Sequence, residues 1–278
     1  MKIISALPLD LKGGEKSRLL AEGTNNLDAY TKVLQGMKLL RGRGAPGDLQ
    51  KARKIAEEVI SLDPDYPRGY TLLASTHLME AMRKRDQSSP QSVARAFQLA
   101  QKALELDDAN IEAHLLLGRI YLMRNQDEKA VAELEKAKAI NPNSTEVIHA
   151  LGRHFLQTGR PHEALALFEK AVLLDPVHAQ KSYVNLGRTY RLLGKNEEAI
   201  SVFKKAVHNQ PDHVNPRLEL IASYSASGKT EEAKAEVDEV LRVNPNFSVR
   251  AYGRRVPMKN TTQKQKFLDL LRKAGLPD

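Results

Sequence analysis

Apolar residues recur along the chain at the spacing of amphipathic helices, and their order repeats about every 34 residues. Within residues 111–144, Leu117 and Tyr121 lie on one face of a first expected helix, and Ala130 begins the apolar face of a second. Pro142 follows directly, where its fixed φ and missing N–H stop further winding. The pattern therefore predicts a hairpin of two helices.

Four series of residues carry the repeat, each with steps of 34 or 35 residues. They are Leu117, Leu151, Leu186 and Leu220; Tyr121, Phe155, Tyr190 and Tyr224; Ala130, Ala164, Ala199 and Ala233; and Pro142, Pro176, Pro211 and Pro245. Continued backwards through Ala96 and Ala52, the series predict six helical units. The units are residues 27–66, 67–110, 111–144, 145–178, 180–213 and 214–247, after a leading helical segment or upstream-domain end at 1–26 and before a basic cap at 248–278.

A glycine follows the repeated leucine in three consecutive units, as Gly118, Gly152 and Gly187. Glycine inside a helix costs about 0.5–1 kcal/mol relative to alanine, so close packing has to offset that cost. We expect these glycines, together with the alanine series of the second helices, to let two backbones approach each other.

These positions resemble the tetratricopeptide-repeat family, most closely in residues 111–144 and 145–178. The resemblance implies an all-α solenoid, a right-handed superhelix of antiparallel helix pairs whose first helices line a concave groove. Proteins of this kind are non-catalytic scaffolds that bind a protein or peptide segment. Phe267 and Leu271 lie on one helical face that Gly275 ends, which predicts a C-terminal capping helix.

Composition narrows the possible settings of the chain. Of its 278 residues 41% are hydrophobic and none is cysteine, which excludes disulfides and thiolate metal sites and favours a cytoplasmic location. No stretch approaches the ~20 apolar residues that cross a bilayer. The formal net charge is +9, and residues 248–278 carry +6 of it. Binding of nucleic acid or an anionic membrane through this end is one alternative, although the absence of tryptophan argues against nucleic acid.

Motifs of catalytic or cofactor sites lack their required context. Gly42, Gly44 and Gly47 match the dinucleotide fingerprint, but a helical segment precedes them instead of a strand. Residues 227–230 (Ser-Gly-Lys-Thr) are similar to the end of a P-loop but lack its leading glycine. The eight histidines are scattered over different repeat positions. We therefore predict no active site, no cofactor and no metal.

Cationic residues recur on the first helices. Arg119, Arg153 and Arg188 each follow the repeated glycine, at a position that resembles the groove-facing ones of the family. The predicted peptide-binding groove consists of Arg119, His149, Arg153, Lys181, Asn185, Arg188 and Arg191. Such a track favours an acidic peptide, a C-terminal carboxylate or a phosphorylated segment. A solvated helix face is the alternative, because unit charges ~10 Å apart in water repel by only about 0.4 kcal/mol.

The two ends of the chain carry a second resemblance. Residues 244–252 and 267–277 are similar to the close of bacterial tetratricopeptide proteins that have a class III adenylate/guanylate cyclase domain and a TolB-like domain upstream. Residues 2–7, 14–19 and 23–30 resemble the junction between such a TolB-like domain and its repeats. This resemblance implies an alternative function, the regulatory C-terminal region of a cyclase-type signalling protein.

Overall fold

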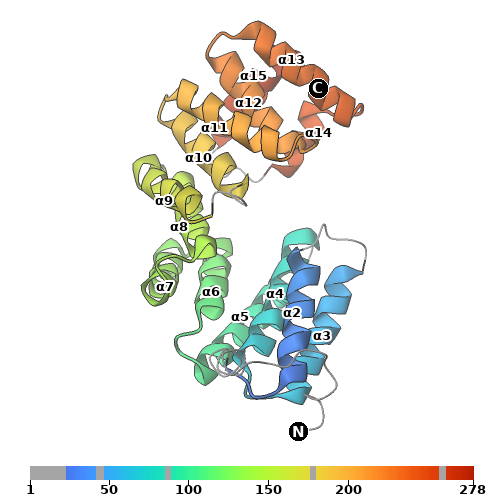
Figure 1. Ribbon diagram of the computed structural model, residues 1–278, viewed down its shortest axis with the longest axis vertical. Helices are drawn as coiled ribbons and strands as arrows, with labels where there is room; N and C mark the ends of the chain where they lie inside the picture. Colours follow the sequence, from blue (N-terminus) through green and yellow to red (C-terminus); the bar gives the residue numbers. More distant parts are fainter. Residues whose placement is uncertain (1–22, 42–46, 85–88, 176–179, 257–260) are drawn as a thin grey trace, which may run out of the picture. The chain divides into compact units, whose positions relative to one another are not determined.

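The computed structural model describes residues 23–41, 47–84, 89–175, 180–256 and 261–278. Every regular element in these ranges is an α-helix, so the predicted all-α fold is confirmed (Figure 1). Most of the leading segment 1–26 and of the glycine motif at 42–47 lies outside the described residues. The chain divides into a first unit, Met1–Pro142, and a second unit, Asn143–Asp278.

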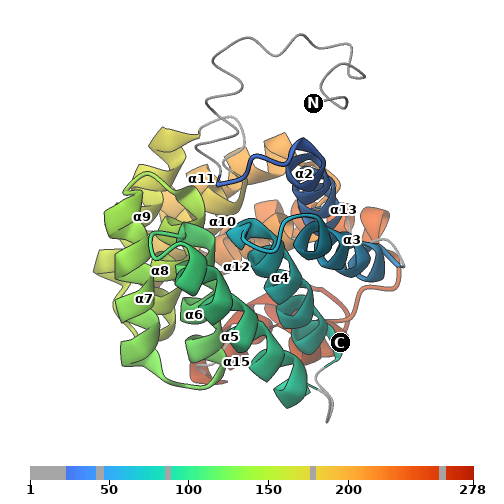
Figure 2. The same cartoon turned by 90° about the horizontal axis from the view of Figure 1, so that it is seen from below.

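The described residues of the first unit form three helix pairs in sequence order. They are α2 (Leu27–Arg41) with α3 (Asp48–Leu62), α4 (Pro67–Lys84) with α5 (Ser89–Leu106), and α6 (Ile111–Met123) with α7 (Asp127–Ile140). The helices of a pair lie side by side (Figures 1 and 2). Each pair also packs on the next, through α3 on α4 and α5 on α6, so that the core runs from pair to pair.

The second unit repeats this arrangement and adds two helices. Its pairs are α8 (Thr145–Gln157) with α9 (Pro161–Leu174), α10 (Gln180–Leu192) with α11 (Asn196–Asn209), and α12 (Val214–Ala226) with α13 (Thr230–Val243). They are followed by α14 (Val249–Arg255) and α15 (Thr261–Lys273). Helix α10 contacts both α8 and α12, the first helices of the neighbouring pairs. We call the surface that these three helices share the first-helix face.

In the four pairs from α6/α7 to α12/α13, the turn between the two helices has one residue in the left-handed conformation. Asn125, Gly159, Gly194 and Gly228 occupy equivalent places and have φ values between 56° and 75°. The N–H of the next residue then bonds to the carbonyl of the repeated aromatic, as from Arg160 in the second unit. The P-loop-like segment 227–230 is one of these turns, between α12 and α13.

The repeated alanines lie in the core, and the repeated glycines make room for the residue four places after each alanine. Ala130, Ala164 and Ala199 are fully buried, as expected. A Cβ added to Gly152 would lie 2.5 Å from the Phe168 ring. Gly118 and Gly187 meet Leu134 and Phe203 in the same way. The glycine therefore makes room for a large side chain of the second helix, a contact that the sequence pattern did not identify.

We expect Gly152→Ala to lower the free energy of unfolding by about 1–3 kcal/mol, because the new methyl group overpacks the site. The higher helix propensity of alanine than of glycine offsets at most about 1 kcal/mol of this loss. Urea denaturation measures the effect, and Phe168→Leu in the same chain should restore part of the loss. Equal stability of Gly152→Ala and the wild type would contradict this packing.

The fourth residue of three first helices ties the helix to the turn before it. Tyr70, His114 and Arg217 each hydrogen-bond to the carbonyl oxygen six residues earlier, at 2.9, 3.0 and 3.0 Å. His114 Nδ1 also lies 2.6 Å from a carboxylate oxygen of Glu133. Arg217 Nη1 makes the equivalent contact with Glu236 at 2.5 Å. His114 and Arg217 therefore join both helices of a pair to the preceding turn, and Tyr70 joins its own helix to that turn.

The C-terminal segment forms the predicted cap at α14 and α15. Helix α15 packs on α12, and its Phe267 and Leu271 are fully buried in the core of the second unit. Gly275, at φ 106°, follows the end of α15, and the N–H of Val249 bonds to the carbonyl of Pro277 at 2.8 Å. The end of the chain is thereby fastened to the start of the cap.

Candidate functional site

The seven residues of the predicted groove fall into both units. Arg119 is the ninth residue of α6 in the first unit and is partly buried. The other six belong to the second unit: His149 and Arg153 on α8, and Lys181, Asn185, Arg188 and Arg191 on α10. His149 and Asn185 contact each other between α8 and α10, whereas Arg188 and Arg191 of α10 contact α12.

His149 joins α8 to α10 through both of its ring nitrogens. Asn185 Nδ2 donates to His149 Nδ1 at 3.2 Å, and Ser182 Oγ lies 3.1 Å from His149 Nε2. Because an amide nitrogen only donates, Nδ1 has to accept, and the proton belongs on Nε2. The ring also packs against Phe168, with its centroid 5.8 Å away. The geometry thus holds a neutral imidazole.

Its surroundings keep the imidazole uncharged. Burial lowers the pKa of His149 from 6.5 to about 4, and the positive charges of Arg153 and Lys181 act in the same direction. Glu146 opposes this lowering only in part. His149 therefore contributes hydrogen bonds to the face at neutral pH, and the positive charge comes from its neighbours.

The lowered pKa predicts that stability falls on acidification. Between pH 6.5 and about 4 the unfolded chain binds a proton at His149 that the folded chain does not, so stability rises with pH across this window and is unaffected above it. The shift corresponds to at most about 3 kcal/mol, at about 1.36 kcal/mol per pKa unit. Urea denaturation at pH 7 and pH 4.5 should show a smaller loss for His149→Gln than for the wild type. Identical losses would contradict the assignment.

Arg153 offers an accessible charge without an acidic partner. Its side chain is exposed, and its Nε donates to the carbonyl oxygen of His149 at 3.2 Å. Within the part of the chain that the structure describes, it pairs with no carboxylate. Although the side chain is exposed, the neighbouring helices displace part of the water around its guanidinium, which lowers the pKa of Arg153. The charge of Arg188 lowers this pKa further. An anion bound here would relieve both effects.

Lys181 adds a second exposed positive charge at the start of α10. It forms no ion pair with the residues that the structure describes. It is close enough to His149 for its charge to lower the histidine pKa. Arg153 follows His149 by four residues on α8, and Lys181 precedes Asn185 by four residues on α10.

The other two arginines of α10 are bound to a carboxylate of the protein itself. Arg188 Nε lies 2.6 Å from one oxygen of Glu219, and Arg191 Nη2 lies 2.8 Å from the other. Burial would raise the pKa of Glu219, but the two arginines outweigh it and lower that pKa. Burial likewise disfavours charged Arg188, yet Glu219 raises the pKa of Arg188. Their charges are thus already compensated.

The cap covers this ion triad. Glu219 on α12 is fully buried. The guanidinium of Arg191 lies over the ring of Phe267 at 5.1 Å from its centroid, and that ring is 6.4 Å from the ring of Tyr252. Burial raises the pKa of Tyr252, and the nearby negative charge of Glu219 adds to the rise. Glu219 and the cap were absent from the predicted site, although both shape it.

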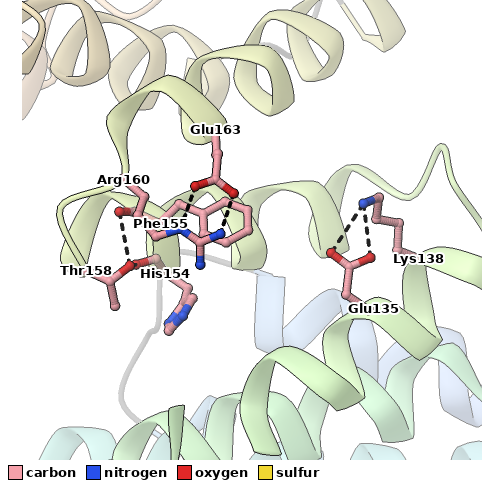
Figure 3. Close-up of polar contacts among 7 residues, drawn as sticks. All are labelled: Glu135, Lys138, His154, Phe155, Thr158, Arg160 and Glu163. Atoms are coloured by element: carbon pink, nitrogen blue, oxygen red, sulfur yellow. Dashed lines mark hydrogen bonds and ion pairs between the residues drawn. The ribbon is translucent and has the colours of Figure 1, made fainter. Parts of the chain in front are cut away.

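Some exposed cations of the chain are paired with carboxylates, and two of them serve as a comparison for Arg153. Arg160 is exposed, holds both oxygens of Glu163 through two nitrogens, and lies over the Phe155 ring at 4.5 Å (Figure 3). In the first unit, Lys138 similarly pairs with Glu135 at 3.0 Å (Figure 3). Such exposed pairs contribute about 0–1 kcal/mol each. Arg153 differs from these two because it is paired with no carboxylate of the residues that the structure describes.

The described residues contain neither a metal-holding cluster nor a helix that could span a membrane. No group of three histidine, aspartate or glutamate side chains in these ranges is arranged to hold a metal ion. In the same ranges, no helix combines the length and the apolar character that a membrane span requires.

Family models give a clear match over the central part of the chain. One model of the tetratricopeptide repeat matches residues 91–154 and 190–253, and a second matches residues 144–211. Together they cover residues 91–253, more than half of the 278 residues.

Solved structures of repeat proteins are similar over most of the chain. The APC/C hetero-tetramer Cut9–Hcn1 superposes with a TM-score of 0.68 at 18% identity, over 99% of this chain and 51% of the other. PilF of Pseudomonas aeruginosa gives 0.60 at 18% identity, over 79% and 93%. YrrB, a tetratricopeptide-repeat protein with an unusual peptide-binding site, gives 0.51 at 20% identity, over 72% and 98%. At these identities the likeness concerns the fold.

Part of the chain is similar in sequence to a curated protein that is named as a cyclase. A protein of Rhizobium meliloti (strain 1021) that is named as an adenylate cyclase is 30% identical over 127 residues. The match covers 45% of this chain and 22% of that protein, so the matched segment spans about a fifth of the relative's length.

Proposed function

Because the chain belongs to the tetratricopeptide-repeat family, whose fold serves as a protein–protein interaction scaffold, we propose that its second unit binds an acidic protein segment on the first-helix face. The contact residues would be Arg153 and Lys181, together with His149 and Asn185. A carboxylate of the partner would pair with the Arg153 guanidinium. The observation that carries the proposal is that Arg153 is exposed and has no acidic partner among the described residues.

The electrostatics of Arg153 favour an anion over a neutral segment. The surrounding helices and Arg188 make its charge unfavourable in the unbound protein, as its lowered pKa indicates. A carboxylate would provide the charge-assisted hydrogen bonds that the site lacks, each worth about 1.5–3 kcal/mol. The guanidinium can also bind both oxygens of a carboxylate, which fixes the orientation of the partner side chain.

Fluorescence anisotropy with a labelled hexaglutamate peptide tests this proposal on the intact chain. We expect hexaglutamate to bind in a salt-dependent manner and hexaglutamine not to bind. Arg153→Ala should weaken binding about ten-fold or more and change the free energy of unfolding by less than about 0.5 kcal/mol, because the residue is exposed.

Arg160→Ala provides the matched control. It removes an exposed arginine of the same unit whose charge is already paired with Glu163. Hexaglutamate affinity should stay within about two-fold of the wild type. Equal weakening by Arg153→Ala and Arg160→Ala would mean that net charge, and not this face, attracts the peptide. Absence of hexaglutamate binding to the wild type would contradict the proposal.

A second candidate function rests on the cyclase relative and on the resemblance of the chain ends. In this alternative the repeats form the regulatory C-terminal region of a cyclase-type signalling protein, and the acidic segment belongs to the catalytic part or to its regulator. Reading the coding sequence upstream of Met1 decides between the two. A class III cyclase domain in the same reading frame supports the alternative, whereas an in-frame stop codon there contradicts it.

A further inference from the structure

We call the surroundings of Arg153 the first place, and the surroundings of Arg188 the second place, of the first-helix face. The two arginines are at equivalent positions of the repeat but have different partners. Arg153 and Arg188 are the ninth residues of α8 and α10, and each helix is 13 residues long. On the helix that follows, the sixth residue is Asn185 for the first place and Glu219 for the second. The repeat thus has an arginine at the same position twice. The sixth residue of the following helix carries an amide in one case and a carboxylate in the other.

At the second place the carboxylate of Glu219 behaves as a bound ligand. Its two oxygens lie 2.6 Å from Arg188 and 2.8 Å from Arg191, and none of its side chain is exposed. The two arginines lower its pKa despite its burial, so that it stays ionised. These are the contacts that an acidic partner residue would make with a pair of arginines.

At the first place no such carboxylate is supplied by the described residues. The amide of Asn185 is directed to His149 at 3.2 Å and carries no charge. Arg153 has only the carbonyl oxygen of His149 as a hydrogen-bond acceptor in the described ranges. The second place is closed because a carboxylate of the protein fills it, and the first place is open because no carboxylate of the described residues does. This difference follows the identity of the sixth residue of the next first helix.

We propose that Glu219 is an internal ligand that fills the carboxylate place between α10 and α12, and that Asn185 keeps the equivalent place between α8 and α10 open for a carboxylate of the partner. This inference rests on the proposed function. It makes the sixth residue of a first helix the determinant of how many acidic residues the face accepts. In this chain, Arg153 binds one partner carboxylate, and Arg188 and Arg191 bind none.

The test is to introduce at the first place the glutamate that Glu219 provides at the second place. Asn185→Glu introduces the carboxylate, and Asn185→Gln is the uncharged reference of the same length. In the hexaglutamate anisotropy experiment, Asn185→Glu should bind at least ten-fold more weakly than Asn185→Gln. Ser201→Glu adds the same charge at an exposed position of α11, a second helix, and should weaken binding less than three-fold relative to the wild type. Equal affinities of the two Asn185 variants would overturn the inference.

A measurement without peptide separates this inference from the proposed function. Proton–nitrogen NMR of the arginine side chains should show the Arg153 Nε–H shifted and slower to exchange in Asn185→Glu than in Asn185→Gln. An unchanged Arg153 signal would overturn the equivalence of the two places. If the wild type fails to bind hexaglutamate while this shift appears, the proposed function fails and the internal role of Glu219 stands.

Discussion

Replacing Glu219 by glutamine should destabilise the second unit more than any other single polar change on the first-helix face. The isosteric amide leaves Arg188 and Arg191 without their carboxylate beneath the cap. Breaking a buried ion pair on one side typically costs about 3–5 kcal/mol. Because the side chain of Arg188 is 30% exposed and can rehydrate, we expect about 3 kcal/mol.

Urea denaturation at pH 7 measures this loss, and Glu163→Gln is the control. Glu163 is an exposed carboxylate with one arginine partner, so its replacement should change stability by less than about 1 kcal/mol. The lowered pKa of Glu219 adds a pH signature: its contribution is complete above the ordinary glutamate pKa and is lost as the pH falls through the lowered folded value. Equal stabilities of Glu219→Gln and Glu163→Gln would contradict the role of the triad.

Truncation of Phe267 should release the C-terminal cap. The ring is fully buried, packs with α12 in the core of the second unit, and lies against the Arg191 guanidinium. A Phe→Ala change in a core costs about 3–5 kcal/mol. We expect Phe267→Ala to lose this much stability, with faster amide exchange in α14, α15 and the α12 residues beneath them.

Phe267→Leu separates loss of packing from loss of the aromatic ring. Leucine fills most of the space, so α15 should stay attached and most of the stability should be retained. Hydrogen–deuterium exchange with mass spectrometry resolves the segments. Unchanged exchange in α15 of Phe267→Ala would show that the cap is held by other contacts.

Hydrophobic periodicity was sufficient to predict the helices because each one buries a single stripe at regular spacing. The alanines at 130, 164 and 199 are buried where the repeat places them. The partner of the glycines was not predictable in the same way, because it depends on which second-helix residue faces them. In the last pair, Ile221 stands in place of the glycine, and Val237 stands where the earlier pairs have leucine or phenylalanine. Both residues lie in the same core. A larger side chain on the first helix thus accompanies a smaller one on the second.

The predicted site was only partly recoverable from the sequence. Residue types and repeat positions place His149, Arg153 and Lys181 on first helices, but they do not report which charges are already paired. Arg188 and Arg191 look equivalent to Arg153 until Glu219 is placed beside them. One signal was available: Glu219 stands between the apolar residues Leu218 and Leu220, and an acidic residue in a buried stretch requires a cation.

Photo-crosslinking in cells tests most directly whether the first-helix face takes an acidic partner. A photoreactive amino acid would replace Lys181 on α10, beside the open place, and Lys205 on α11 in a matched strain. Mass spectrometry then gives the sequence of the crosslinked peptide. We predict that position 181 captures one protein through a segment rich in aspartate or glutamate, and that Arg153→Ala abolishes the crosslink. Capture of the same peptide from both positions, or of a segment without acidic residues, would contradict the proposed binding face.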